Sequence, residues 1–546
     1  MVGTVRLSSP RLLGWAAVTG IGAATVIFIV ISLAGPSGAV VTMPAPAFGP
    51  PWWFSLHLTL EPVLVALWAA AIIGGAGTAA GLAAVRRGAR PPARMLLAAG
   101  FVAAGLLTVL PPAGSTDALD YAVYGRTVIV GHDPYVMTPG QLREAEDAIG
   151  EAAPNAWATR FSPYGPLATA EEAAAAALGG TSVARITFWL KLWNALAFGA
   201  IAIALDRLLR SDPARRARAH LLWSVNPLLL WNLVAGGHVD ALAAAFGFLG
   251  LTLVAGRQRE DHPGALAALA AGALVGAAAD IKITYALFGL AVAWVTIRSP
   301  WTLVAAGAGG LAVLIPSYAW SGTPALTVLL HRSGMVTSDN FYQLFARPFG
   351  HTRPPHLLWI VVALLLAVAA LLLARLPEGF PALPAVRPAL AVSVAWLVVW
   401  PYQYPWYDGI VLCLLALYPA SRLDWVMLVR LTAGTCWTLP GMAVGRRPGW
   451  LGLVTRLEHF PLLPTIMLGV LAAVVTLAVM QAWNPGGRGT AGPAATSPPK
   501  WPAAGVSGRS SGACPREPAA GSRAGAQPER ASGDPGQRGT GRPGRG

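Results

Sequence analysis

The sequence predicts an all-α polytopic membrane protein with about fourteen transmembrane helices. Of its 546 residues, 55% are hydrophobic and only 12% are charged. That is about half the charged fraction of an ordinary soluble protein, so a soluble multidomain enzyme is excluded. The net charge of +15 comes without a basic stripe interleaved with aromatic residues, so no nucleic-acid partner is expected. The three cysteines, an odd number without short spacing, predict neither a disulfide framework nor a metal site.

The N-terminal region, residues 1–112, contains apolar stretches near 12–34, 59–85 and 95–112. No clear small-residue cleavage site follows the first stretch, so we expect a retained helix and not a removed signal peptide. Arginines gather in alternate short loops such as 86–94 and 207–218, whereas loop 113–182 is acidic. By the positive-inside rule, both termini face the cytoplasm and the acidic loop faces outside.

Residues 113–183 form a long polar outer loop, which is the first place to expect a functional site. If the segment that opens it is helical, Asp117, Asp120 and Tyr124 lie on one face, because residues three and four apart are neighbours on a helix. Two carboxylates one turn apart suit proton abstraction from a sugar hydroxyl, or the binding of a cation. Alternatively, Asp117 simply caps the helix.

Two turn-rich segments of the same loop each place a tyrosine beside a proline, at Asp133-Pro134-Tyr135 and at Pro163-Tyr164. Such rings suit the C–H faces of sugars, although both segments are also compatible with ordinary turns. Further on, Thr169 and Glu172 have the spacing of a capping box at the start of an alanine-rich run. That run, to Leu178, is too short to span a bilayer, so we expect it to lie along the membrane surface.

The region 184–483 contains the remaining spans and an outer loop at 320–355, with breaks at Gly236-Gly237 and at 280–282 that indicate broken or re-entrant helices. Polar residues at membrane edges are costly unless used or paired. Asp280 and Lys282 either neutralise each other, or Lys282 acts with Arg332 to grip a phosphate. The aromatic cluster at 400–408 is either an interfacial belt or a binding site. The Gly-, Pro-, Ala- and Arg-rich tail, 484–546, is expected to be a disordered, basic, cytoplasmic segment.

Several of these motifs, taken in order, resemble one family of enzymes. The actinobacterial polyprenol-phosphate-mannose-dependent α-(1→6)-mannosyltransferases, which are GT-C-type glycosyltransferases, have similar strings. The strings are Asp117-x-x-Asp120-Tyr121-Ala122-x-x-Gly125-Arg126, Gly131-x-Asp133-Pro134-Tyr135, Ser162-Pro163-Tyr164-Gly165-Pro166-Leu167, Asn226-Pro227-Leu228, Gly237-His238-x-Asp240-Ala241 and Pro405-Trp406-Tyr407-Asp408.

The resemblance implies a GT-C-like bundle whose first outer loop carries short interfacial helices. It also implies transfer of mannose from a polyprenyl-phosphate donor to a cell-envelope glycan or glycolipid acceptor at the outer face of the bacterial membrane. The family's catalytic acid maps onto Asp117, with Asp120 as a second candidate. No nucleotide takes part in such a reaction, so neither a cofactor nor a nucleotide-clamping metal is expected. The candidate substrate-binding residues are Tyr121, Arg126, Asp133, Tyr135, Tyr164, His238, Asp240, Lys282, Arg332, Tyr402, Trp406, Tyr407 and Asp408.

Two other classes are compatible with the composition. A transporter or lipid flippase also has many spans with scattered charges, although its polar site is expected near the membrane midplane, on broken helices. A non-catalytic scaffold for envelope assembly would need neither carboxylate of the outer loop.

Overall fold

The computed structural model describes residues 9–254, 264–331, 335–351, 354, 356–379, 382–442 and 449–483. These residues all belong to one unit, Met1–Ala494. Within the described ranges the elements are helical, and extended pairing is limited to the isolated antiparallel bridge between Val40 and Ala113. The all-α class is therefore confirmed. The predicted disordered tail, 484–546, and Arg332 lie outside the described residues.

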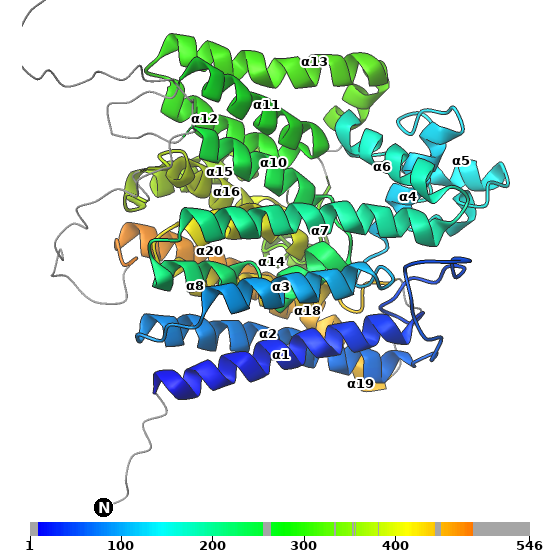
Figure 1. The fold of residues 1–546 in the computed structure, drawn as a ribbon, viewed down its shortest axis with the longest axis horizontal. Helices are drawn as coiled ribbons and strands as arrows, with labels where there is room; N and C mark the ends of the chain where they lie inside the picture. Colours follow the sequence, from blue (N-terminus) through cyan, green and yellow to red (C-terminus); the bar gives the residue numbers. More distant parts are fainter. Residues whose placement is uncertain are drawn as a thin grey trace, which may run out of the picture. The chain divides into compact units, whose positions relative to one another are not determined.

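The N-terminal half of the unit contains three long or medium helices, a group of short ones, and a long helix that follows them (Figure 1). The bounds are α1 (Pro10–Ala34), α2 (Leu60–Arg86), α3 (Ala93–Thr108), α4 (Asp117–Ile129), α5 (Pro139–Glu144), η1 (Gly150–Ala152), α6 (Pro166–Gly179), α7 (Val183–Leu208), α8 (Pro213–Leu222), α9 (Pro227–Leu229), η2 (Leu230–Ala235) and α10 (Asp240–Leu253).

The second half continues with helices of very different lengths. The bounds are α11 (Ala265–Ile281), η3 (Ile283–Ala286), α12 (Leu287–Thr296), α13 (Pro300–His331), α14 (Gln343–Ala346), η5 (Arg347–Phe349), α15 (Leu357–Arg375), α16 (Val386–Val399), η6 (Pro405–Asp408), α17 (Gly409–Leu417), α18 (Leu423–Thr438), α19 (Gly449–Leu457), η7 (Glu458–Leu462) and α20 (Leu463–Val479). Part of the outer loop expected at 320–355 is therefore helical, because α13 continues beyond a kink at Gly322.

Six helical segments are long and apolar enough to cross a membrane: α1, α2, α7, α13, α15 and the segment 449–479. The bent pair formed by Pro213–Ala235 and Asp240–Leu253 raises this to seven, among the residues that the structure describes. The predicted count of about fourteen spans is not confirmed, because many of the apolar stretches fold as helices of only 9–17 residues. The prediction of a broken helix at Gly236-Gly237 is confirmed by the 114° bend in that pair.

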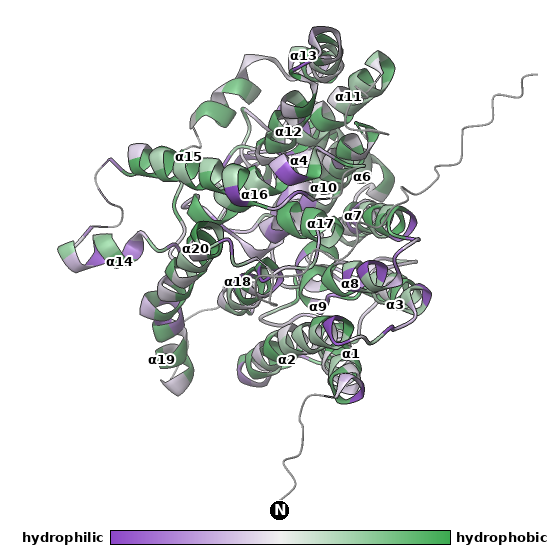
Figure 2. Cartoon of the chain, turned by 90° about the vertical axis from the view of Figure 1, so that its left-hand side faces the viewer, coloured by the Kyte–Doolittle hydropathy of each residue, from purple (hydrophilic) through white to green (hydrophobic). Residues whose placement is uncertain are grey.

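The outward faces of the long helices are apolar. Large side chains such as Trp15, Trp301 and Trp359 are between 69% and 81% exposed, and apolar residues dominate α1, α2 and α15 in the view of Figure 2. Extended apolar surface of this kind marks a face that water does not solvate, which in a chain with long spanning helices is a lipid-facing surface. The structure is thus that of a multi-pass membrane protein.

Small residues allow the long helices to approach closely, as is common inside membranes. At the α1–α2 contact, a Cβ atom added to Gly20 would lie 2.9 Å from the Cα atom of Gly77. At the α11–α13 contact, a Cβ atom on Gly272 would lie 1.9 Å from the carbonyl oxygen of Ala306. Backbones therefore touch at these two crossings.

The short helices bring three polar chain breaks together. Asp240 begins α10, Lys282 follows the last residue of α11, and Tyr407 lies in η6, just before α17. With 14, 17 and 9 residues, these helices fall short of the roughly 20 residues that a bilayer crossing requires. In Figure 1, α4 and α6 lie at one end of the bundle, where α6 contacts α11. The residues at these helix ends are therefore the place to look for a site.

Candidate active site

Asp117 is the first residue of α4, and its carboxylate lies where the helix dipole favours a negative charge. The N-cap Thr116 makes no side-chain capping bond, and the backbone N–H of Asp117 donates to Oγ of Ser115 at 3.1 Å. The carboxylate of Asp117 instead faces His238, whose Nε2 atom lies 3.5 Å from Oδ2, and the hydroxyl of Tyr121 lies at the same distance. The alternative in which Asp117 is only a helix cap is therefore wrong. Its side chain is 18% exposed, so it is reachable.

The net effect of these surroundings is to lower the pKa of Asp117. Burial raises the pKa, but the neighbouring side chains of His238 and Ser115 lower it, and the positive charge of Lys282 lowers it further. The carboxylate is therefore ionised near neutral pH, which is the state that a general base requires.

The chain immediately before Asp117 is held by a buried lysine that the sequence analysis did not single out. The Nζ atom of Lys191, on α7, donates to the carbonyl oxygens of Leu107 and Leu110, both at 2.6 Å, and to that of Pro111 at 3.1 Å. The end of α3 and the turn that leads into α4 are therefore fixed from inside the bundle. A lysine in a mostly apolar helix was the available signal.

His238 lies in the sharp turn between η2 and α10. Gly237 adopts a φ of 68° there, and a Cβ atom at this position would lie 3.0 Å from the Cγ atom of Lys191. The imidazole Nδ1 atom bonds to the carbonyl oxygen of Asn232, and the ring stacks on Trp406 with centroids 3.9 Å apart. Its Nε2 atom is buried without a hydrogen-bond partner and faces Asp117. The ring is thus held in one orientation with one nitrogen directed at the carboxylate.

Lys282 lies between α11 and η3, and its backbone is extended. Its Nζ atom donates to both carboxylate oxygens of Asp240, at 2.8 and 2.7 Å, and lies 3.9 Å from the ring centroid of Tyr407. The idea that Asp280 neutralises Lys282 is therefore wrong, because the neighbouring helix end supplies the partner. Asp280 points elsewhere and accepts a hydrogen bond from the backbone of Leu167 at 3.3 Å.

That contact is part of what places Tyr164. A Cβ atom at Gly165 would lie 1.6 Å from the carbonyl oxygen of Asp280, so only glycine allows this loop to rest on the end of α11. The hydroxyl of Tyr164 then lies 3.1 Å from that of Tyr121, with the rings edge to face. Tyr135 supports the same loop, because its hydroxyl donates to the carbonyl oxygen of Tyr164 at 2.9 Å. Tyr135 therefore positions Tyr164.

The aromatic residues of 402–407 form an aromatic wall that packs against His238 and Lys282. Tyr404 stacks on Trp406 with centroids 4.5 Å apart, and Trp406 stacks on His238. Tyr402 packs against Tyr404 and Tyr407 at 5.3 and 6.4 Å. These rings therefore pack on the polar cluster, as expected of a site and not of a lipid-facing belt. Tyr404 was missed as a candidate, although it belongs to the same aromatic run.

Besides Tyr135, four predicted residues in the described ranges do not join this cluster. Asp120 is 4% exposed, and the charge of Asp117 and burial raise its pKa well above the usual range, with burial the larger cause. Arg126 pairs with Asp147 at 2.8 Å. Asp133 accepts a hydrogen bond from the backbone of Tyr135 at 2.8 Å, as in an ordinary turn. Asp408 pairs with the guanidinium of Arg430 on α18.

The cluster therefore combines an ionised carboxylate, a histidine, a lysine–aspartate pair and several aromatic rings. It contains Asp117, Tyr121, Tyr164, His238, Asp240, Lys282, Tyr402, Tyr404, Trp406 and Tyr407. In the described part of the chain, no group of three or more His, Cys, Asp or Glu side chains could hold a metal ion. The arrangement suits removal of a proton from a hydroxyl beside a positive charge that attracts an anion.

Fold and site together define a multi-span helical membrane protein with a carboxylate-centred site at the end of the bundle where α4 and α6 lie. Residues 18–298 match the family model for the N-terminal domain of alpha-(1->6)-mannopyranosyltransferases. The chain belongs to this family, as the sequence motifs indicated. The match includes the carboxylate, histidine and lysine of the cluster but not the aromatic wall.

Curated relatives bear related names. A probable alpha-(1->6)-mannopyranosyltransferase of Mycolicibacterium smegmatis is 31% identical over 136 residues, which are 25% of this chain and 24% of the relative. Alpha-(1->6)-mannopyranosyltransferase B of Corynebacterium glutamicum is 26% identical over 142 residues, 26% of this chain and 24% of the relative. The aligned parts thus span about a quarter of each relative's length. No solved structure matches the chain.

Proposed function

We propose that the chain is a GT-C-type glycosyltransferase of the bacterial cell membrane that moves mannose from a polyprenyl-phosphate donor to a cell-envelope glycan or glycolipid. In this proposal both termini face the cytoplasm, the Asp117 end faces outside, and the shorter apolar helices supply further membrane spans. The observation that carries the proposal is the reachable carboxylate of Asp117 next to His238 and within range of the charge of Lys282. Membership of the mannopyranosyltransferase family supports mannose as the sugar.

The proposed reaction is a single displacement with inversion at the anomeric carbon. The acceptor hydroxyl oxygen forms the new bond to that carbon, and its proton passes to the carboxylate of Asp117. The bond from the carbon to the phosphate oxygen breaks, and its electron pair leaves with the prenyl phosphate. That leaving group needs a cation more than a general acid, which is the role proposed for Lys282 and, as the sequence suggested, Arg332.

The remaining residues of the cluster have supporting roles in this proposal. The half-buried rings of Tyr164 and Tyr402 offer faces and hydroxyl groups on which a sugar can lie, and the buried rings of Tyr121 and Tyr407 pack against them. Asp240 holds Lys282 through its two short contacts, so that the ammonium group stays beside the site. Asp120 lies buried one helical turn from Asp117, so it is proposed to support Asp117 and not to contact the substrate.

The substitution Asp117→Asn tests the base. It keeps the shape of the side chain and removes the proton acceptor, so mannose transfer from a polyprenyl-phosphate donor should fall about 10²–10⁴-fold. Initial rates of product formation, measured with purified full-length protein in lipid vesicles, give the comparison. Unchanged size-exclusion profiles and circular dichroism would show that folding is retained.

Asp212→Asn is the matched control, because the same chemical change falls on the N-cap of α8, where the side chain accepts from two backbone N–H groups. Asparagine is also a good N-cap, so this variant should transfer mannose at the wild-type rate. A wild-type rate in Asp117→Asn would remove Asp117 from the mechanism and leave the enzyme proposal without its base.

A transporter or lipid flippase is the second candidate, because a 114° bend and an extended lysine interrupt the helices at the site. Broken helices near the midplane are typical of transporter binding sites. Vesicles that contain the protein but no glycosyl donor distinguish the two. Movement of a fluorescent lipid or of mannose across such vesicles, with no product when the donor is added, would favour transport.

A further inference from the structure

Lys191, on α7, is a buried lysine whose described partners are all backbone atoms. It is 0% exposed, and its Nζ atom donates to the carbonyl oxygens of Leu107, Leu110 and Pro111 at 2.6, 2.6 and 3.1 Å. An ammonium group has three N–H donors. All three are therefore used within the protein, so Lys191 has no donor left for a substrate.

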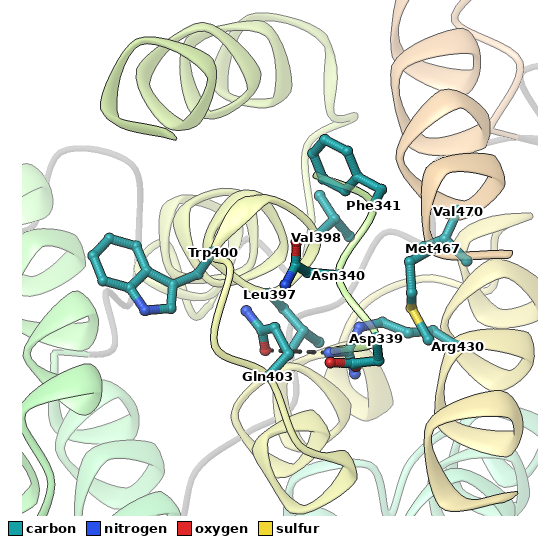
Figure 3. Close-up of a pocket in the computed structure, with 10 residues that line it drawn as sticks. All are labelled: Asp339, Asn340, Phe341, Leu397, Val398, Trp400, Gln403, Arg430, Met467 and Val470. Carbon is teal, nitrogen blue, oxygen red and sulfur yellow. Dashed lines mark hydrogen bonds between the residues drawn. The ribbon is translucent and has the colours of Figure 1, made fainter. Parts of the chain in front are cut away.

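Arg430, by contrast, is a buried cation that pairs with a carboxylate. Its guanidinium group contacts Asp408 and donates to the side-chain oxygen of Gln403 at 3.2 Å, the dashed contact in Figure 3. Taking a charge out of water is unfavourable, and a carboxylate partner offsets part of that cost. In the described part of the chain, the hydrogen-bond partners of Lys191 include no carboxylate. What its burial provides is a fixed backbone between α3 and α4.

The sequence explains why the backbone needs a donor at this place. In an α-helix, the carbonyl oxygen of each residue accepts from the N–H group four residues further on. For Leu107, near the end of α3, that residue is Pro111, which has no N–H group, and Pro112 follows it. The last carbonyl groups of a helix need other partners. The ammonium group of Lys191 is such a partner, and it reaches two further carbonyl groups in the turn.

The turn that Lys191 holds is tied to the segment that carries His238. The backbone N–H of Ala113 donates to the carbonyl oxygen of Ala235 at 3.1 Å. Asp117 follows shortly after the first of these residues, and His238 shortly after the second. The carboxylate and the imidazole are therefore the ends of two short segments that share a backbone hydrogen bond.

The stem of Lys191 contacts the second segment as well. A Cβ atom at Gly237 would lie 3.0 Å from Cγ of Lys191 and 3.7 Å from Cβ of Ala118. These contacts involve the residue before His238 and the residue after Asp117. The 3.5 Å between Nε2 of the histidine and Oδ2 of the aspartate is thus set where both segments meet this lysine.

We infer that Lys191 is a positioning residue for the proposed base, because its three carbonyl contacts and its stem hold Asp117 beside His238. The inference rests on the proposed function and assigns Lys191 no contact with the substrate. A misplacement of about 1 Å in a catalytic group can cost about 10²-fold in rate. Loss of the ammonium group should therefore lower kcat and leave KM unchanged.

Two substitutions with side chains of nearly equal length test this role. Lys191→Met removes every N–H donor, whereas Lys191→Gln keeps two. In Lys191→Met, kcat per folded molecule should fall about tenfold to a hundredfold, with an unchanged KM for polyprenyl-phosphate mannose. Lys191→Gln should lose less, because its amide can still donate to a carbonyl oxygen. Full-length protein in lipid vesicles gives both constants, and size-exclusion chromatography gives the folded fraction.

The pH profile is a readout that loss of stability alone would not move. Since His238 lowers the pKa of Asp117, separating the two should move the acidic limb of kcat/KM towards neutral pH. This shift should be larger in Lys191→Met than in Lys191→Gln. The titratable groups that lie within electrostatic range of Asp117 are Asp120, Tyr121, Tyr164, His238, Asp240, Lys282 and Tyr404.

Arg218→Met is the matched control. Arg218 is also a buried cation that donates to carbonyl oxygens at a helix end, those of Leu415 and Tyr418 at 3.0 and 2.8 Å. Its loss should destabilise the fold and leave kcat per folded molecule and the acidic limb as in the wild type. An equal shift of the limb in this control would overturn the inference.

The kinetic result has two other outcomes that would overturn the inference. One is an unchanged kcat and an unchanged acidic limb in Lys191→Met and Lys191→Gln. The other is a raised KM with an unchanged kcat, which would make Lys191 part of substrate binding. If Lys191→Met does not fold, the comparison of Lys191→Gln with the wild type decides in the same way.

Hydrogen–deuterium exchange separates this inference from the proposed function, because it needs no turnover. Peptides that cover residues 113–117, in which Ala113 donates to Ala235, should exchange several-fold faster in Lys191→Met and at the wild-type rate in Arg218→Met. Faster exchange in a protein that transfers no mannose would support the positioning role and contradict the proposed function. Mannose transfer by the wild type, with unchanged exchange in Lys191→Met, would overturn the inference alone.

Discussion

Two buried charge clusters in this protein differ in how completely they are satisfied. Asp424 on α18 receives the guanidinium of Arg218 at 2.5 and 2.9 Å and that of Arg86 at 3.0 Å. Arg218 also donates to the carbonyl oxygens of Leu415 and Tyr418 at the end of α17. This cluster joins α2, α8, α17 and α18, and its short, saturated contacts are those of a structural tie.

The cluster around Asp117 is different. Its contacts to His238 and Tyr121 are both 3.5 Å long, and the Nε2 atom of His238 has no hydrogen-bond partner. Oδ1 of Asp120, one turn further along α4, also has none. A buried polar group without a partner is rare in a stable protein unless it has a function. In this bundle, a candidate site therefore differs from a structural tie in that some of its buried polar groups lack hydrogen-bond partners, more than in the presence of charge.

The largest expected effect comes from breaking the saturated cluster. Arg218→Met leaves Asp424 with one partner fewer in a buried position, which typically costs about 3–5 kcal/mol. The free energy of unfolding in detergent, followed by circular dichroism, should fall by this amount, while the transfer rate per folded molecule stays the same. Arg207→Met, at an exposed position on α7, is the matched control and should be nearly neutral. Equal losses in both variants would show that the cluster is not a structural tie.

A smaller effect is expected from a substitution of His238 in the cluster around Asp117. The neighbouring His238 lowers the pKa of Asp117 against the effect of burial, so His238→Gln should raise that pKa. A base loses activity as the pH falls through its pKa, so the acidic limb of the kcat/KM profile should move towards neutral pH. Transfer rates between pH 4 and 8 test this, with a several-fold loss expected at the acidic end and little loss at the alkaline end.

His132→Gln is the control for this profile, because His132 is an exposed histidine on the outer loop 113–183 that also carries Asp117. Its acidic limb should coincide with that of the wild type. If the limb of His238→Gln also coincides, the histidine does not set the protonation of Asp117, and the contrast between the two clusters loses its chemical meaning.

The sequence was informative where a feature is local. The helical spacing of Asp117, Asp120 and Tyr124 and the break at Gly236-Gly237 depend only on neighbouring residues, and the structure has both a helix from Asp117 and a bend at the glycines. The partner predicted for Lys282 was wrong, because Asp280 is close in sequence whereas Asp240 is close only when α10 and α11 are packed. Asp408 likewise pairs with Arg430, which is 22 residues away on another helix. Pairings between helix ends need the three-dimensional arrangement.

Helix boundaries also show what local patterns miss. The capping-box pattern at Thr169 and Glu172 predicted a helix start there, but α6 begins at Pro166 with Gly165 as its N-cap. The hydroxyl of Thr169 instead contacts that of Tyr135 at 2.8 Å, and both carboxylate oxygens of Glu172 are buried without a hydrogen-bond partner. A proline at the first helical position is compatible with a helix start, and Thr169, now inside the helix, contacts Tyr135 and caps nothing. The number of spans was overestimated for a related reason, since hydropathy alone does not show where an apolar stretch bends.

The smallest effect is expected at a third place, where α6 buries an acid without any partner. Both carboxylate oxygens of Glu171 lack a hydrogen bond, and burial raises the pKa of Glu171 to about 8. The folded protein then holds a proton that the unfolded chain loses above its ordinary pKa of about 4.5, so stability falls as the pH rises between these values. Glu171→Gln removes this titration and should therefore stabilise the protein by a few degrees at pH 8 but hardly at pH 5.

Glu144→Gln, an exposed position on α5, should show no such pH dependence. Equal melting shifts of Glu171→Gln at both pH values would mean that Glu171 is solvated or paired, and unsatisfied oxygens would then be a weaker guide to function than the comparison of the two clusters suggests.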